Sequence, residues 1–93
     1  MKFAWKDVAQ LLDGSYDCGK VAASTLTDII SLEELPAVVG CLCSSYALSD
    51  NVVTRTNTAL ALQHICQRFS SDMQLLIESG VNNYLQCLML FHQ

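Results

Sequence analysis

One pattern of apolar residues recurs along most of this 93-residue chain, and it is the pattern of an amphipathic helix. Apolar side chains at i, i+3, i+4 and i+7 share one face of an α-helix. Strand-like alternation is nearly absent, and the single proline, Pro36, lies where a helix is expected to start. The sequence therefore predicts an all-α fold. The three stripes are Trp5-Val8-Ala9-Leu12, Leu35-Val38-Val39-Leu42 and Val81-Tyr84-Leu85-Leu88.

A second stripe occurs twice and indicates an internal repeat. Its copies are Ala22-Ala23-Leu26-Ile29-Ile30 and, 36 residues later, Thr58-Ala59-Leu62-Ile65-Cys66. The small residues at the start of each copy predict a close approach between helices. The stripes that begin at Trp5 and Leu35 lie 30 residues apart, and Ser15-Tyr16 and Ser45-Tyr46 keep that offset. Offsets of this size are typical of helical repeats.

Turn chemistry sets the expected helix boundaries. Gly14 is expected to end the first helix, and Ser31 with Glu34 forms a capping-box pattern. A loop is expected between Ser44 and Asp50, with Ser49 or Asp50 capping the next helix. We predict five to six helices in one domain spanning residues 1–93, including short or open-ended helices at Asp72–Glu78 and Val81–Phe91.

The segment from Thr58 to Leu88 resembles an armadillo repeat. The residues that carry the resemblance are ALALQHIC at 59–66, LIESGV at 76–81 and YLQCL at 84–88. They resemble the third helix of one repeat, then the first helix, glycine corner and second helix of the next. The resemblance implies a short right-handed armadillo/HEAT-like solenoid segment, whose usual work is protein binding.

The resemblance also implies where a partner binds. In peptide-binding armadillo proteins, third helices line a concave groove in which a tryptophan and an asparagine clamp an extended peptide. Leu60 and His64 stand at those positions here, which argues against a groove that grips extended basic peptides. The implied partner-binding ladder consists of Lys20, Ser24, Asp28, Thr56, Leu60, His64 and Gln67.

The two ends of the sequence lie inside the repeat pattern, and the last stretch is strongly apolar. An uncapped repeat exposes its stacking face. We therefore expect the terminal faces to be covered by a second copy, by a partner or by the rest of a longer protein. The residues of this possible terminal interface are Trp5, Leu88, Met89 and Phe91.

Charge and cysteine content exclude several classes of protein. The net charge is −4 and the five basic residues are scattered, so direct nucleic-acid binding is not expected. The longest apolar run, Ala37 to Cys43, is too short to span a bilayer, and no secretory signal opens the chain. The five cysteines are odd in number and four lie in helical patterns. They predict reduced thiols packed in the core and an intracellular protein, cytoplasmic or nuclear.

No catalytic or metal-binding constellation stands out. His64 and Cys66 are two residues apart on one helix, so they point in different directions and do not form a nucleophilic pair directly. Cys41 and Cys43 splay apart for the same reason, unlike the close-spaced ligands of zinc sites. We therefore expect no enzyme, no metal and no cofactor.

The favoured function is a protein–protein interaction or scaffold module that binds a peptide or helix of a partner. The alternative is a death-fold-like adaptor bundle that assembles by homotypic contacts. A small enzyme or metal protein using Cys and His residues is the third hypothesis. Under the solenoid hypothesis we expect contacts only between helices adjacent in sequence, whereas a bundle packs globally.

Overall fold

The computed structural model describes residues 4–72, and these residues are helical throughout apart from short connections. The all-α prediction is therefore confirmed for this part of the chain. The predicted helices beyond Asp72 lie outside the described residues. The elements are α1 (Trp5–Gln10), η1 (Leu11–Asp13), α2 (Tyr16–Ile29), η2 (Leu32–Glu34), α3 (Leu35–Leu48), α4 (Val52–Arg68) and η3 (Ser70–Asp72), where η denotes a 3-10 helix.

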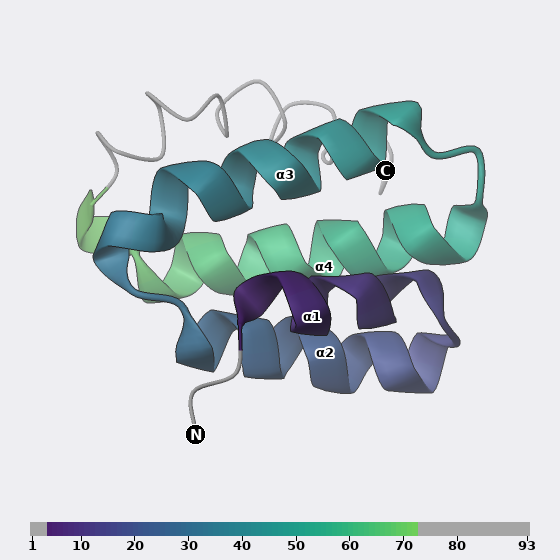
Figure 1. The fold of residues 1–93 in the computed structure, drawn as a ribbon, viewed down its shortest axis with the longest axis horizontal. Coiled ribbons are helices and arrows are strands. Elements are labelled where there is room, and N and C mark those ends of the chain that lie inside the picture. The colour runs from purple at the N-terminus through teal and green to yellow at the C-terminus, as the bar shows by residue number, and fades with distance from the viewer. Residues whose placement is uncertain (1–3, 73–93) are drawn as a thin grey trace.

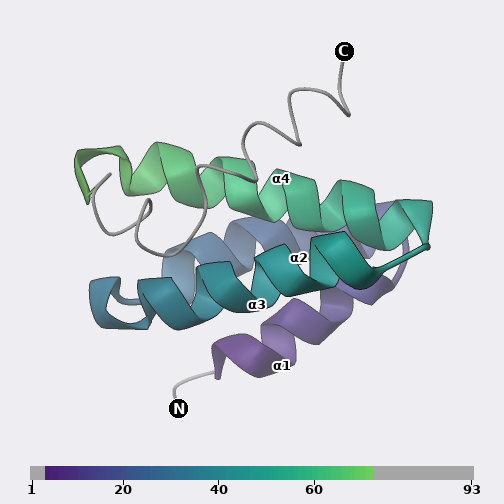
Figure 2. The same ribbon diagram turned by 90° about the horizontal axis from the view of Figure 1, so that it is seen from above.

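The four α-helices within residues 4–72 form two layers. In Figure 1, α1 and α3 run in one direction, while α2 and α4 run in the opposite direction. The view from above in Figure 2 places α1 and α3 in one layer and α2 and α4 in the other. The slab measures 37 × 30 × 19 Å. No helix within residues 4–72 combines the length and the apolar character that crossing a membrane requires.

The most extensive helix contact joins α2 to α4, which are not neighbours in sequence. The criterion stated above for a solenoid, contacts only between helices adjacent in sequence, is therefore not met. Small residues explain the contact: Ala22, Ala23, Thr58 and Ala59 are each at most 1% exposed, as the repeated stripe predicted. Helix axes can approach closely where side chains are this short.

Asn57 ties the start of α4 to the turn between η1 and α2. Its Nδ2 donates to the carbonyl oxygens of Leu12 at 2.9 Å and Ser15 at 3.3 Å, and the side chain is buried. The carbonyls at a helix C-terminus lack partners within the helix, so this amide supplies one from outside. Gly19 of α2 faces the same amide, and a Cβ at this position would overlap it.

Two arginines of α4 do the same for the other helices. Nη1 of Arg68 donates to the carbonyls of Thr27 and Ile30 at the end of α2. Nη1 of Arg55 donates to the carbonyl of Tyr46 at 2.7 Å, near the end of α3, and the guanidinium lies over the Tyr46 ring. Side chains of α4 therefore cap the C-terminal ends of η1, α2 and α3.

Two of the predicted boundaries are confirmed. The helical segment α1–η1 stops at Asp13, and Gly14 follows as the expected break. Ser31 and Glu34 form the full capping box, with the Ser31 amide donating to Glu34 Oε1 at 2.9 Å and the Glu34 amide donating to Ser31 Oγ at 3.3 Å. Pro36 occupies the first turn of α3, where its missing N–H has no consequence.

The predicted loop from Ser44 to Asp50 is wrong in its first half. α3 continues to Leu48, because Tyr46 is buried and Arg55 satisfies its carbonyl oxygen. The cap is also different: Asn51, rather than Ser49 or Asp50, accepts from the first amides of α4, which begins at Val52.

The offset of 30 residues does not extend beyond the stripes. Ser15 is the N-cap of α2 and Tyr16 is its exposed first residue. Ser45 and Tyr46 lie inside α3, and Tyr46 is buried. The two Ser-Tyr pairs therefore occupy unrelated places, and their matching offset is a coincidence of sequence.

Candidate functional site: the α2–α4 face and the grooves beside α1

The α2 members of the predicted ladder form a solvent-exposed stripe along the helix. Each of them directly follows a buried residue: Gly19, Ala23 or Thr27. Gly19 faces Asn57 of α4, so the next residue is turned about 100° away from that contact. The three ladder residues that this places beside the α2–α4 contact are Lys20, Ser24 and Asp28, all of them exposed.

The α4 members of the ladder precede the residues that make the α2–α4 contact, whereas the α2 members follow theirs. Each directly precedes a residue that is buried or that caps α2: Asn57, Ala61, Ile65 or Arg68. Among them Leu60 packs partly against the core. The four ladder residues are Thr56, Leu60 and His64, which are half-buried, and Gln67, which is exposed.

These two stripes emerge on one side of the α2–α4 layer. The helices are parallel, because Asn57 reaches the start of α2 while Arg68 reaches its end. Each residue of an α-helix is turned about 100° from the one before it. On two parallel helices, the residue that follows a contact residue on one helix and the residue that precedes a contact residue on the other therefore point to the same side of the pair. The side facing α1 is different, since Val21 and Ala22 line a groove with α1. We call the surface of the seven ladder residues the ladder face.

The ladder face has a mixed chemistry suited to contact with a polypeptide. Lys20 brings a cation near the start of α2, and Asp28 an anion near its end. Leu60 and His64 supply a partly apolar centre on α4. Apolar area surrounded by polar groups is the usual composition of a protein interface.

The residues of the predicted terminal interface have separate outcomes. Trp5 is half-buried, packs against the core and lines a pocket between α1 and α3. Leu88, Met89 and Phe91 lie outside the described residues. The expectation of a covered terminal face stays a prediction.

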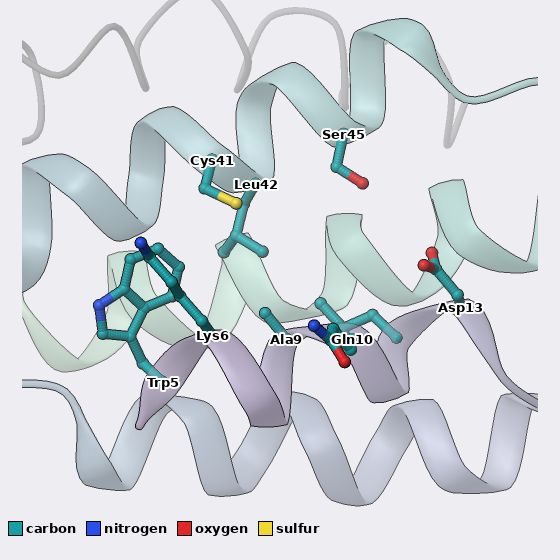
Figure 3. A pocket seen from close by; sticks show the side chains of 9 residues that line it. Trp5, Lys6, Ala9, Gln10, Asp13, Cys41, Leu42 and Ser45 are labelled. Atoms are coloured by element: carbon teal, nitrogen blue, oxygen red, sulfur yellow. The ribbon is translucent and has the colours of Figure 1, made fainter. Parts of the chain in front are cut away.

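The pocket between α1 and α3 has a volume of about 300 Å³. Figure 3 shows Trp5 and Lys6 at one end and Asp13 at the other, with side chains of α3 along the opposite rim. Of the residues that line this pocket, the sequence analysis named only Trp5 as a binding residue. The small residues Cys41 and Ser45, one turn apart on α3, are the sequence feature that could have indicated a gap beside this helix. The lining residues are Trp5, Lys6, Ala9, Gln10, Leu12, Asp13, Cys41, Leu42 and Ser45.

A second groove, of about 280 Å³, lies between α1 and α2 and is almost wholly apolar. Its exposed apolar members are Leu11 and Val21, which are 55% and 67% exposed. Neither belongs to a predicted stripe, so the helical periodicity gave no sign of them.

The cysteines divide into two groups, which corrects the prediction that the helical thiols all pack in the core. Cys43 is buried and Cys66 is half-buried against the core, but Cys41 is exposed on the rim of the α1–α3 pocket. Its position two residues before Cys43 turns it to the other side of α3. Cys18 is exposed, and Cys87 lies outside the described residues.

Burial controls the chemistry of the inner thiols. It raises the pKa of Cys43 to about 12, with a smaller contribution from the Cys66 thiol, and burial likewise raises the pKa of Cys66. A thiol is nucleophilic as its thiolate, so both groups are unreactive near neutral pH. His64, expected on the surface, is half-buried. Within residues 4–72 no three His, Cys, Asp or Glu side chains converge in a way that could hold a metal ion.

Comparison with known proteins returned no relative: no family model, curated protein or solved structure matches this chain.

Proposed function

We propose that this chain is a protein–protein interaction module whose ladder face binds a peptide or helix of a partner. The observation that carries the proposal is the convergence of two stripes, chosen from sequence alone, on one side of the parallel α2–α4 pair. Their register beside the contact leaves Lys20, Ser24, Asp28 and Gln67 exposed to a partner.

An armadillo/HEAT-like arrangement is the finer part of this proposal. Two features support it: α1 and α3 share one direction and one layer, while α2 and α4 share the other. Two successive helix pairs are therefore placed alike. By the criterion used above, the α2–α4 contact counts for a bundle; that criterion is too strict, because equivalent helices of adjacent units in a stacked repeat also touch, so this contact is compatible with both arrangements.

A matched pair of substitutions tests the binding face. Ser24→Arg places a long cation in the ladder face, whereas Ser44→Arg makes the same change at an exposed position of α3. Proteins captured from a cell extract by the wild-type chain should also be captured by the Ser44→Arg variant and lost by the Ser24→Arg variant. Circular dichroism of both variants verifies that the helices are intact.

Two outcomes contradict the proposal. If both variants retain the same captured proteins, the binding surface lies elsewhere. If the purified chain captures nothing but copies of itself through homotypic contacts, the adaptor-bundle hypothesis is favoured instead. Leu60 is left unchanged in this test because its partial packing against the core would mix binding with stability.

A further inference from the structure

The α1–α3 pocket offers a second binding surface, on the layer opposite to the ladder face. α1 packs on α2 and α3 packs on α4, and the space between α1 and α3 stays open above the core (Figure 3). Small side chains keep it open: Ala9 on α1 and Cys41 and Ser45 on α3 do not reach across. The buried side chains of Leu12 and Leu42 form an apolar floor.

The pocket has opposite charges at its two ends. Lys6 lies beside Trp5, with its Nζ 5.8 Å from the centre of the indole ring. Asp13 closes the other end, seven residues further along α1 and η1 (Figure 3). Within the described part of the chain neither side chain has an ion-pair partner. The rise along the helix separates these two residues by roughly 10–12 Å.

This separation matches a spacing found in helices. Residues i and i+7 of an α-helix share a face and lie about 10.5 Å apart, with i+4 between them on the same side. A helix in a groove is a recurrent mode of recognition in which such residues are the anchors. Its backbone hydrogen bonds are already made, so a mostly apolar pocket can accept it without leaving polar groups unpaired.

We propose that the α1–α3 pocket binds an amphipathic helix of a partner protein that carries an acidic and a basic residue seven positions apart. A large apolar side chain at the intervening position enters between Trp5 and the floor. The acidic residue lies against Lys6 and the basic residue against Asp13. This site is distinct from the ladder face and does not depend on the proposed function.

Three synthetic 15-residue helical peptides without tryptophan test the charge requirement. They carry Glu, Leu and Lys at i, i+4 and i+7, or the same leucine between two glutamates or two lysines. Trp5 is the only tryptophan of the chain, so its fluorescence reports binding at this pocket directly. The Glu-Leu-Lys peptide should bind the wild-type chain more tightly than either like-charged peptide, and an alanine in place of its leucine should abolish the signal.

A charge reversal with a matched control makes the test decisive. Asp13→Lys should shift the preference toward the two-glutamate peptide by about tenfold, because a contact at one end changes from attraction to repulsion. Asp50→Lys makes the same change of net charge in the exposed α3–α4 loop and should leave the order of the three peptides unchanged. Raised salt should reduce the difference between the peptides.

Several results would overturn the proposal. Equal shifts from Asp13→Lys and Asp50→Lys would mean that net charge alone sets the affinity. Peptide binding that leaves Trp5 fluorescence unchanged would place it elsewhere, and no binding at millimolar peptide would exclude it. If Trp5 fluorescence instead follows protein concentration as dimers form in sedimentation, a second copy of this chain is the occupant.

Discussion

The packing of Gly19 against Asn57 gives the strongest test of how α2 and α4 are joined. A Cβ on residue 19 would overlap the carboxamide of Asn57, which is 1% exposed and donates two hydrogen bonds. In Gly19→Ala the new methyl group would overlap the Asn57 carboxamide, so this amide has to move. The substitution therefore tests the close approach rather than the helix propensity of α2.

The magnitude follows from three contributions. Overpacking a filled site costs about 1–3 kcal/mol. Loss of the two hydrogen bonds costs about 1 kcal/mol each. Alanine in a helix is about 1 kcal/mol more favourable than glycine, which offsets part of this. Gly19→Ala should therefore lower the free energy of unfolding by about 2–4 kcal/mol, a large share of the roughly 5–14 kcal/mol expected for a chain this long.

In the Asn57→Ala background, Gly19→Ala should stabilise the chain instead of destabilising it. Asn57→Ala alone removes both hydrogen bonds and leaves the Leu12 carbonyl without its partner, which costs about 2–4 kcal/mol. In that background Gly19→Ala meets no amide, so the helix-propensity gain of up to about 1 kcal/mol remains. The coupling energy of the pair should be about 3 kcal/mol or more, whereas distant sites add within a few tenths.

Urea unfolding followed by circular dichroism measures each variant. Gly40→Ala is the control, because a Cβ at position 40 of α3 meets no atom within 4 Å. It should stabilise the chain by up to about 1 kcal/mol. If Gly19→Ala also stabilises the wild-type chain, the close α2–α4 approach is refuted.

Three further predictions concern single side chains. Thr58→Val should raise the free energy of unfolding by about 1–2 kcal/mol, because the buried Thr58 hydroxyl has no hydrogen-bond partner; a loss of stability in urea unfolding would count against this. Arg68→Met should cost about 1–3 kcal/mol, since it keeps much of the side-chain length but leaves the Ile30 carbonyl without its donor, and thermal unfolding measures the loss. Peptide-level mass spectrometry after brief alkylation at pH 7.5 should find Cys41 modified and Cys43 intact until urea is added; equal labelling would contradict the burial of Cys43.

The raised pKa of Cys43 also predicts how stability depends on pH. The unfolded thiol ionises near 9.0 and the folded thiol near 12, so the unfolded state loses its proton first. Ionisation therefore favours the unfolded state: the free energy of unfolding keeps its full value below pH 9 and falls as the pH rises from 9 toward 12. Cys43→Ala should flatten the decline between pH 9 and 12 in urea unfolding, and an unchanged slope would contradict this source.

Periodicity predicted those parts of the fold that depend on local spacing. The stripe from Leu35 to Leu42 is buried throughout, and the Ser31 capping box forms as its residues suggest. Both depend on residues within about two turns of each other. The end of α3 was mispredicted because its last turn is held by Arg55, which lies on the next helix. A serine pair inside a helix resembles a loop when that distant donor is unknown.

The two candidate surfaces also differ in whether they depend on local spacing or on contacts between distant residues. The ladder residues were chosen from the armadillo resemblance, and those on each helix lie on one side of it because a helical stripe is a local property. The α1–α3 pocket was not foreseen, since it arises where two helices from separate pairs fail to touch. Only the stacking of α1 on α2 and of α3 on α4 decides how wide that space is.

The orientation of the ladder face depends on side chains that do not belong to it. Arg55, Asn57 and Arg68 cap three different helix ends, and together they anchor α4 to α3, η1 and α2. This anchoring leaves the residues just before the contact turned toward solvent. A change at Asn57 that leaves the chain folded but releases α4 should therefore weaken partner binding without touching the ladder. The polar residues of α4 that stabilise the fold thus also determine which of its residues can meet a partner.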